Sequence, residues 1–350
     1  MNTPETSAVP ATPSNAAPSK MSAAKVVATL VALGLAGVLL YYSLRGISWG
    51  EVWILISGVK KEYLVLVCLL NTVALFLRAY RWRVLLSSAG PVSVSTAFWA
   101  TSIGYFGNNF LPARAGELAR TMMISTRAGL ARAYVLTTAL LERMVDALAL
   151  VVISALVLLT LPSQPDWLGK ATKPFAIVGT IGVISIALLP RLEKLGVEIL
   201  RRLPIPDGIR DKLIGWLEHI LDGFRAFHDA GRASTFLGLT IVIWCLDAVS
   251  AVTCAKGLGL DLPLPVAFLL ITGLGLGSAL PSTPGYVGIY QFVAVSILTP
   301  FGFRKADAIG YILMIQVVSY VLVGLWGSLG FWHFRRKPEE APAAAMNQIV

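Results

Sequence analysis

The feature that most constrains this chain is a series of apolar runs, each long enough to cross the hydrocarbon core of a bilayer. Such a core is about 30 Å thick and is crossed by about 20 helical residues. With 56% apolar and 14% charged residues and a mean hydropathy of +0.73, the chain is predicted to be an all-α polytopic membrane protein. Six segments are predicted to cross in full: 24–44, 62–78, 134–160, 174–190, 234–256 and 309–334.

Two further apolar stretches, 91–130 and 264–300, are interrupted and do not fit as single spans. The first contains "GNNFLPARAGELAR" (Gly107 to Arg120) and the second "LPSTPGYVG" (Leu280 to Gly288). Because proline and glycine break helices, each stretch is predicted to form a hairpin of two short helices that enters and leaves on one side. Irregular backbone persists at membrane depth where it is buried in protein or lines a wet cavity. The first tip is therefore predicted to face a polar cavity; the alternative is a short amphipathic segment in a cytoplasmic loop.

Lysine and arginine counts set the predicted orientation. With the N-terminus in the cytoplasm, the inside segments hold 20 of these residues and the outside segments hold 8. The positive-inside rule then places both termini in the cytoplasm. A disordered cytoplasmic tail is predicted over 1–23, followed by a membrane domain over 24–335 and a second disordered tail over 336–350. Within the membrane domain, an amphipathic cytoplasmic segment, 191–232, separates the two repeats.

The two interrupted stretches belong to a predicted internal repeat. Repeat one covers 62–160 and repeat two covers 234–334, with element starts offset by 172, 173 and 175 residues. The tips "LPARAGE" and "LPSTPGY" share the pattern L-P-x-x-x-G. In the predicted topology the two hairpins enter from opposite sides, as in secondary transporters built from inverted repeats with broken helices. The sequence thus predicts six full spans plus two re-entrant helical hairpins arranged as inverted repeats.

Three ionisable residues, Glu142, Arg143 and Asp146, lie inside the predicted span 134–160. A charge at such depth costs about 2.5–3.5 kcal/mol on insertion scales, so it marks a candidate functional site. Glu142 and Asp146 are four residues apart, share a helix face and require a cation. The candidates for that cation are Arg114, Arg120 and Arg143. The group either binds substrate or is an ion-pair network that fastens the first hairpin to its neighbouring span.

The second hairpin has a different chemistry, because the stretch from Gly273 to Gln291 contains no charge. The N-terminus of a half-helix after the break would suit a phosphate. Neutral hydrogen-bonding groups are offered by Ser282, Thr283, Tyr286, Tyr290 and Gln291. Asp247 is the other charge in the predicted membrane core of this repeat. Arg78, Arg81 and Arg83 are expected to anchor a helix end among lipid headgroups.

Several functional classes are not favoured by the residues. The three cysteines form no CxxC pair and the three histidines show no metal-ligand spacing, so neither a metal nor another cofactor is expected. The net charge of +10 is attributed to cytoplasmic lysine and arginine rather than to nucleic-acid binding. No G-x-x-x-x-G-K-[ST] motif is present, so any transport is expected to be passive or ion-coupled.

Three ordered motifs, "NNFLPARAGELAR", "ERMVD" and "LPSTPGYVGIYQ", resemble a known family. It is the lysylphosphatidylglycerol synthase transmembrane, or flippase-like, family of bacterial and archaeal inner-membrane proteins. The family includes the N-terminal flippase half of multiple peptide resistance factors. The resemblance covers Ala24 to Arg336 and implies a lipid-translocating domain of the inner membrane with two re-entrant helices. No aminoacyltransferase domain follows in this sequence, so lysine transfer from tRNA is not expected and the lipid need not be lysylphosphatidylglycerol.

The resemblance also implies particular residues. In the first hairpin and the next span these are Asn109, Pro112, Arg114, Gly116, Glu117, Arg120, Glu142, Arg143 and Asp146. In the second hairpin they are Pro281, Pro284, Gly285, Gly288 and Gln291. The prolines and glycines are expected to shape the tips, and the polar residues, with Ser282, Thr283 and Tyr286, to bind the substrate.

The leading hypothesis is a transporter that moves an anionic or headgroup-modified lipid between leaflets. Its two tips, Leu111–Glu117 and Leu280–Tyr286, would approach one another across a shared mid-membrane cavity, related by a two-fold axis in the membrane plane. Arg114 and Arg143 would face that cavity beside carboxylates. One alternative is a membrane-embedded enzyme that uses Glu117, Glu142 or Asp146 as base or nucleophile. The other is a non-catalytic partner of an enzyme of lipid or envelope-glycan synthesis. The oligomeric state stays open.

Overall fold

The computed structural model describes residues 23–111, 115–160, 229–278 and 284–336, with a few isolated residues between 177 and 227. These residues form ten α-helices and two short 3₁₀ turns, without a strand among them. The prediction of an all-α protein is therefore confirmed. Most of the span 174–190, most of the segment 191–232 and all but residues 23 and 336 of the two predicted tails lie outside the described residues, as do Pro112, Arg114, Pro281, Ser282 and Thr283.

The first half of the chain contains two leading helices and then the four helices of repeat one. The leading helices are α1 (Ala23–Leu44) and α2 (Trp49–Ser57). Repeat one follows as α3 (Lys61–Leu86), α4 (Val94–Phe110), α5 (Ala115–Ala128) and α6 (Arg132–Thr160). The sequence did not predict α2, a short helix whose Val52 is buried in the core. It also ended the first span of the repeat at residue 78, whereas α3 continues for two more turns.

Repeat two has the same order of elements. It comprises α9 (Ala230–Gly257), α10 (Leu264–Gly277), the turn η2 (Pro284–Tyr286), α11 (Ile289–Leu298), the turn η3 (Thr299–Phe301) and α12 (Lys305–Arg336). Among the described residues, α3, α9 and α12 are long and apolar enough to cross a membrane, judged by length and composition. This supports three of the six predicted spans, 62–78, 234–256 and 309–334.

Both interrupted stretches are broken where the sequence predicted. Helix α4 ends at Phe110, after which Leu111 is extended and Pro112 follows. Around η2 the chain turns through left-handed backbone at Gly285 (φ 71°), Tyr286 (φ 61°) and Gly288 (φ 92°). Glycine adopts this conformation without a steric penalty, which explains two of these three positions.

Helices α4 and α5 cross so closely that glycine is required on both sides of the crossing. A Cβ atom added to Gly107 would lie 2.5 Å from the Cα atom of Gly116, and one added to Gly116 would overlap the carbonyl oxygen of Gly104. Small residues at such crossings let helix backbones approach one another. The backbones of α4 and α5 are therefore in direct contact next to the tip of the first hairpin.

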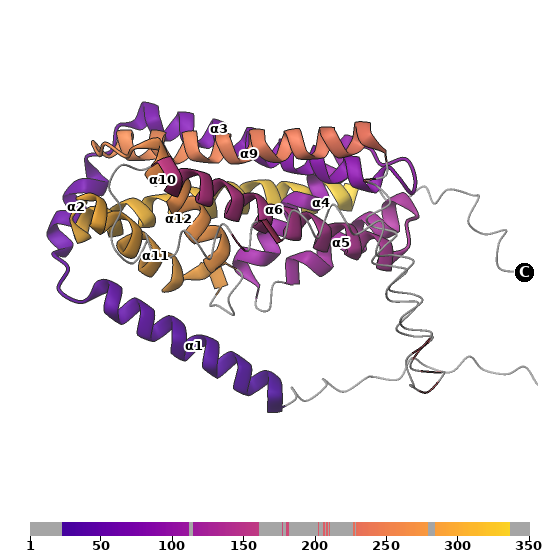
Figure 1. Ribbon diagram of the computed structural model, residues 1–350, viewed down its shortest axis with the longest axis horizontal. Helices are drawn as coiled ribbons and strands as arrows, with labels where there is room; N and C mark the ends of the chain where they lie inside the picture. Colours follow the sequence, from indigo (N-terminus) through magenta and orange to yellow (C-terminus); the bar gives the residue numbers. More distant parts are fainter. Residues whose placement is uncertain are drawn as a thin grey trace, which may run out of the picture.

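The contacts between helices follow a two-fold pattern (Figure 1). Helices α3 and α9 pack antiparallel, with the Lys60 amide donating to the Gly257 carbonyl at 2.9 Å. Helix α4 packs on α12 as α10 packs on α6, and α5 packs on α6 as α11 packs on α12. The starts of corresponding helices are offset by 169, 170, 174 and 173 residues. The hairpin α4–α5 lies toward one end of the bundle and α10–α11 toward the other; the inverted orientation of the two repeats in a membrane stays a prediction.

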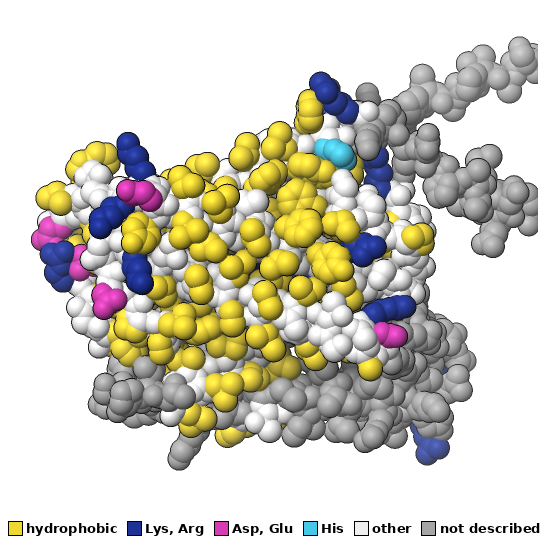
Figure 2. Space-filling model, turned by 90° about the horizontal axis from the view of Figure 1, so that it is seen from above, with side chains coloured by type: hydrophobic (Ala, Val, Ile, Leu, Met, Phe, Trp, Pro, Cys, Tyr) yellow, Lys and Arg dark blue, Asp and Glu magenta, His cyan; other side chains and the backbone are white. Residues whose placement is uncertain are grey.

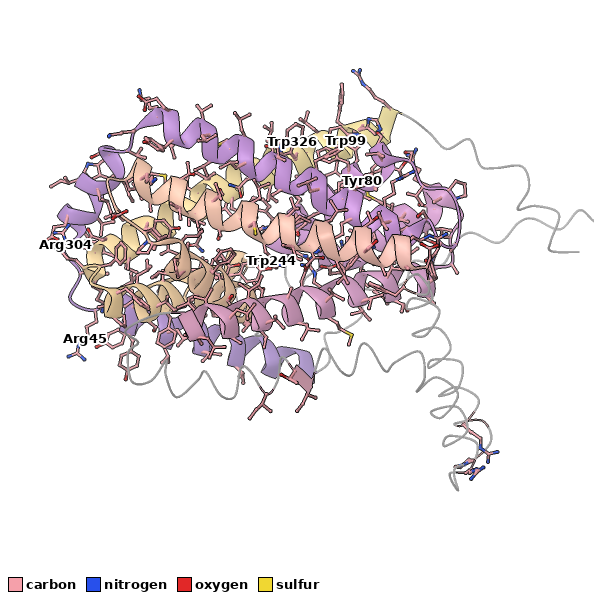
Figure 3. The ribbon with its side chains drawn as sticks, turned by 45° about the horizontal axis from the view of Figure 1, so that its top comes forward. Arg45, Tyr80, Trp99, Trp244, Arg304 and Trp326 are labelled. Carbon is pink, nitrogen blue, oxygen red and sulfur yellow. The ribbon has the colours of Figure 1, made fainter. Side chains whose placement is uncertain are left out.

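The surface is apolar between charged ends. Figure 2 shows hydrophobic side chains across the middle of one face, with lysine, arginine and acidic side chains gathered toward its two ends. In Figure 3, Arg45 and Arg304 lie at the same end of the molecule, and Tyr80 and Trp99 lie toward the opposite end. An apolar band of this kind between polar rims is the surface that a bilayer covers.

Candidate functional site: an ion network beside the first hairpin

Arg81 of α3 is the most deeply buried charge of the described protein. Its Nη1 donates to Asp146 Oδ1 at 2.6 Å and its Nη2 donates to Asp146 Oδ2 at 2.8 Å. The same Nη2 donates to Glu142 Oε1 at 2.9 Å, and Nη1 also donates to the Thr240 hydroxyl at 3.0 Å. The planar guanidinium matches a carboxylate in this bidentate geometry. Arg81 thereby joins α3 to α6 and α9.

Arg120 of α5 extends the network to the first hairpin. Its Nη1 donates to Glu142 Oε2 at 3.0 Å, and its Nε donates to Glu117 Oε2 at 2.6 Å. The guanidinium also lies over the ring of Trp82, 4.4 Å from its centroid. Glu142 is therefore shared by two buried arginines, one from α3 and one from α5. This arrangement fastens the hairpin to both helices that flank it.

The outer part of the network is accessible. Arg143 Nη2 donates to Glu117 Oε1 at 2.8 Å, and the two side chains are 41% and 23% exposed, against 2% for Arg120. Asn108 Nδ2 donates to the same Glu117 oxygen at 3.1 Å. The network thus has a buried part around Glu142 and an open part at the pair of Arg143 and Glu117.

A second ion pair links the two repeats. Arg78 of α3 donates to Asp247 of α9, and its guanidinium lies 5.9 Å from the Trp244 ring centroid. Together the two groups of pairs contain four arginines and four carboxylates: Arg78, Arg81, Arg120 and Arg143, with Glu117, Glu142, Asp146 and Asp247. Their formal charges cancel, so each buried charge has a partner of opposite sign.

The second hairpin is held by neutral groups. Gln291 Oε1 accepts from the Gly288 amide at 2.7 Å, and Gln291 Nε2 donates to Gln316 Oε1 at 2.6 Å. Gln316 Nε2 and the Tyr320 hydroxyl both donate to the Gly285 carbonyl, at 3.0 and 2.7 Å. Tyr286 and Tyr290 stack beside this tip, with ring centroids 4.9 Å apart.

The described parts of the two tips lie together, and the shared cavity between them stays a prediction. Helix α4 contacts η2, and the rings of Phe110 and Tyr320 are 6.1 Å apart while Tyr320 bonds to Gly285. Two surface hollows lie elsewhere and contain no residue of the ion network. One, of about 450 Å³, lies along α1. The other, of about 310 Å³ between α3 and α12, is lined by Leu64, Val65, Cys68, Leu69, Thr72, Leu322, Leu325 and Trp326.

The structure brings several predicted residues together and corrects one prediction. Glu117, Arg120, Glu142, Arg143 and Asp146 form one network. The expectation that Arg78 and Arg81 lie among lipid headgroups is wrong. Helix α3 continues past residue 78 and carries Arg81 into the protein interior, where two carboxylates bind it, and Arg78 pairs with Asp247 of α9. The signal was available in the sequence: the paired carboxylates needed a cation, and an arginine in the first helix of the same repeat could supply it.

The other predicted residues take these places. Arg83 donates to the Val92 carbonyl at 2.6 Å. Asn109 bonds to the Tyr105 carbonyl within its own helix, so Asn108 is the asparagine beside the charges. Sequence reasoning also missed Gln316 and Tyr320, which carry no charge and therefore gave no signal inside an apolar span. Among the described residues, no group of three histidine, cysteine or acidic side chains could hold a metal ion.

Comparison with known proteins places the chain in a family. Residues 28–327 match the family described as "Lysylphosphatidylglycerol synthase TM region". This chain belongs to the lysylphosphatidylglycerol synthase TM-region family. A UPF0104 membrane protein of Methanothermobacter thermautotrophicus is 23% identical over 303 residues, which cover 79% of this chain and 86% of that protein. A UPF0104 membrane protein of Pyrococcus horikoshii is 23% identical over 288 residues, covering 77% and 86%.

A further relative carries an enzyme name. Glycosyltransferase AglD of Haloferax volcanii is 25% identical over 248 residues, which are 61% of this chain and 39% of AglD. This chain thus spans well under half the length of that relative. The match to the lysylphosphatidylglycerol synthase TM-region family, together with the long apolar helices, makes this chain a multi-pass membrane protein.

Proposed function

We propose that the protein moves an anionic or headgroup-modified lipid between the leaflets of the inner membrane, with both termini in the cytoplasm. The observation that carries this proposal is the open end of the ion network. Arg143 and Glu117 are a partly exposed pair beside the break of the first hairpin, whereas the rest of the network is buried. A lipid phosphate can take the place of Glu117 on Arg143, because both are anions that a guanidinium binds bidentately.

Two re-entrant hairpins that meet near mid-membrane provide the path in this proposal. The hairpin tips would bind the headgroup while the acyl chains stay in lipid, and Arg114 would lie at the first tip. Exchange of partners at Arg143 keeps the arginine neutralised throughout, so no step leaves a bare charge in hydrocarbon. The buried pairs around Glu142 hold the hairpin in place and are not displaced.

The alternative is an enzyme that acts on a lipid headgroup, or a partner of such an enzyme. The name of AglD is the observation in its favour. The carboxylates that would serve as base or nucleophile are engaged by arginines in the resting protein: Glu117 by Arg120 and Arg143, and Asp146 by Arg81. These ion pairs would have to be broken before either carboxylate could act on a substrate, so we favour transport.

The test is reconstitution in vesicles with a fluorescent anionic phospholipid. The wild-type protein should exchange the lipid between leaflets without forming a product. Arg143→Lys keeps the charge but loses the guanidinium fork, and should slow exchange about tenfold, equivalent to roughly one charge-assisted hydrogen bond. Arg304→Lys is the matched control, because Arg304 also pairs with carboxylates but is 66% exposed at the end of the bundle.

The outcomes separate the three functions. Slow exchange in Arg143→Lys with normal exchange in Arg304→Lys supports transport through the open pair. A wild-type rate in a folded Arg143→Lys protein would show that this arginine is structural. Product formation by the wild type would favour the enzyme, and neither exchange nor product would favour the non-catalytic partner.

A further inference from the structure

The polar groups that hold the second hairpin join the same pair of helices as those that hold the first. Arg120 of α5 bonds to Glu142 of α6 at 3.0 Å, and Gln291 of α11 bonds to Gln316 of α12 at 2.6 Å. The members of these pairs are offset by 171 and 174 residues, whereas the starts of their helices are offset by 174 and 173. Gln291 therefore lies three residues, about one helical turn, nearer the start of its helix than Arg120 does. The two side-chain pairs join the same two helices of each repeat at neighbouring turns.

The correspondence extends to the neighbours of each pair. Arg120 bonds to Glu117, three residues earlier, at 2.6 Å. Gln291 bonds to the amide of Gly288, also three residues earlier, at 2.7 Å. Each pair thus joins the start of the helix after the break to the last helix of its repeat.

The last helix of each repeat, α6 or α12, also carries a further polar residue four positions after its member of the pair. Asp146 lies four residues after Glu142, and Tyr320 lies four residues after Gln316, so each shares a helix face with the member of the pair. Asp146 accepts from Arg81, whereas the Tyr320 hydroxyl donates to the Gly285 carbonyl at 2.7 Å. In repeat two, this further polar residue, Tyr320, therefore bonds to the hairpin tip itself.

We propose that Gln316 and Tyr320, with Gln291, are positioning residues that fix the tip of the second hairpin, as the neutral counterpart of the charged network at the first. Two donors converge on one carbonyl, that of Gly285, whose left-handed backbone (φ 71°) the surrounding structure must maintain. Because Gln291 is buried and both ends of its amide are used within the protein, its role is to hold the tip.

The consequence for transport rests on the proposed function and specifies which hairpin binds the anionic part of the headgroup. With a neutral tether, the second hairpin presents no carboxylate that a phosphate must displace and no arginine that it must bind. The anionic part of the headgroup then exchanges partners at the first hairpin alone, through Arg143. The second tip contributes shape and hydrogen bonds to the uncharged part of the headgroup.

The test compares two tyrosines of α12. Tyr320→Phe removes one donor to Gly285 and keeps the ring. Tyr311→Phe is the matched control, because the Tyr311 hydroxyl also donates to a backbone carbonyl, that of Ala251 at 3.0 Å, away from both tips. Both changes are made in a protein whose three cysteines are replaced and which carries Val287→Cys, a partly exposed position beside the second tip.

The first readout is the labelling rate of Cys at position 287 by a water-soluble maleimide. Tyr320→Phe should raise this rate severalfold, because the Gly285 carbonyl loses one of its two donors, and Tyr311→Phe should leave it unchanged. The second readout is lipid exchange, which Tyr320→Phe should slow at least fivefold and Tyr311→Phe should not change. Equal labelling in the two variants would overturn the proposal.

The two readouts keep the inference separate from the proposed function. Faster labelling in Tyr320→Phe, with no exchange by the parent protein either, would reject lipid transport and leave the positioning of the tip supported. Faster labelling with an unchanged exchange rate would overturn the claim that the position of the tip matters for transport.

Discussion

Replacement of Glu142 by glutamine is the sharpest test of the buried network. The change keeps the size and shape of the side chain but removes the negative charge between two buried guanidinium groups. Glu142 accepts from Arg81 at 2.9 Å and from Arg120 at 3.0 Å. A glutamine offers one acceptor oxygen and one amide donor, so one of the two arginines would face a donor instead of an acceptor.

The expected loss of stability follows from the hydrogen-bond partners that each arginine keeps in the Glu142→Gln variant. Arg81 still binds both oxygens of Asp146, so the loss falls mainly on Arg120, which keeps Glu117. Removal of one partner from a buried ion pair costs about 3–5 kcal/mol, and the remaining partners favour the lower end, about 3 kcal/mol. An unfolding entropy of about 2.1 cal/mol/K per residue gives about 1.4 °C per kcal/mol for 350 residues, so the melting temperature in detergent should fall by about 4 °C.

A second variant tests the cause. Glu142→Gln combined with Arg120→Gln removes one charge of each sign. It places two glutamines between α5 and α6, as Gln291 and Gln316 are placed between α11 and α12. The double variant should regain about 1–2 kcal/mol relative to Glu142→Gln alone, as coupled neighbours do. Glu51→Gln is the control, because Glu51 is 47% exposed in its pair with Arg304 and should lose less than about 1 kcal/mol. A single variant that melts within about 2 °C of wild type, or a double variant less stable than the single one, would refute the reasoning.

Two further predictions concern the hairpins and their orientation. Gly116→Ala should reduce the free energy of unfolding by about 3 kcal/mol or more, because its Cβ would overlap the Gly104 carbonyl oxygen. Gly37→Ala is the control and should be neutral or slightly stabilising, since no atom lies within 4 Å of its added Cβ. Equal melting temperatures for the two variants would contradict the close crossing of α4 and α5. In a cysteine-free protein, Ala89→Cys before α4 and Asp261→Cys before α10 should react with an impermeant thiol reagent from opposite sides of the membrane, whereas labelling from the same side would exclude inverted repeats.

The sequence alone determined the features that depend on local chemistry and on the bilayer. Proline and glycine in "NNFLPARAG" and "LPSTPGYVG" interrupt helices wherever they occur, so both breaks were predicted at the positions where the structure has them. Apolar runs of sufficient length must be helical in lipid, which gave the all-α class. The cost of a charge in hydrocarbon identified Glu142, Arg143 and Asp146 as residues that need partners.

Only the tertiary structure decided which partners they have. Arg81 lies 61 residues from Glu142 in the chain, and no local pattern states that α3 and α6 pack side by side at that depth. Gln316 and Tyr320 show the same limit more strongly, because a neutral polar side chain in a span costs too little to be noticed in a sequence. Their role arises from the fold, which brings α12 against a tip 31 and 35 residues away. Long-range pairing of this kind depends on how whole helices pack, and the residues of any one helix do not encode it.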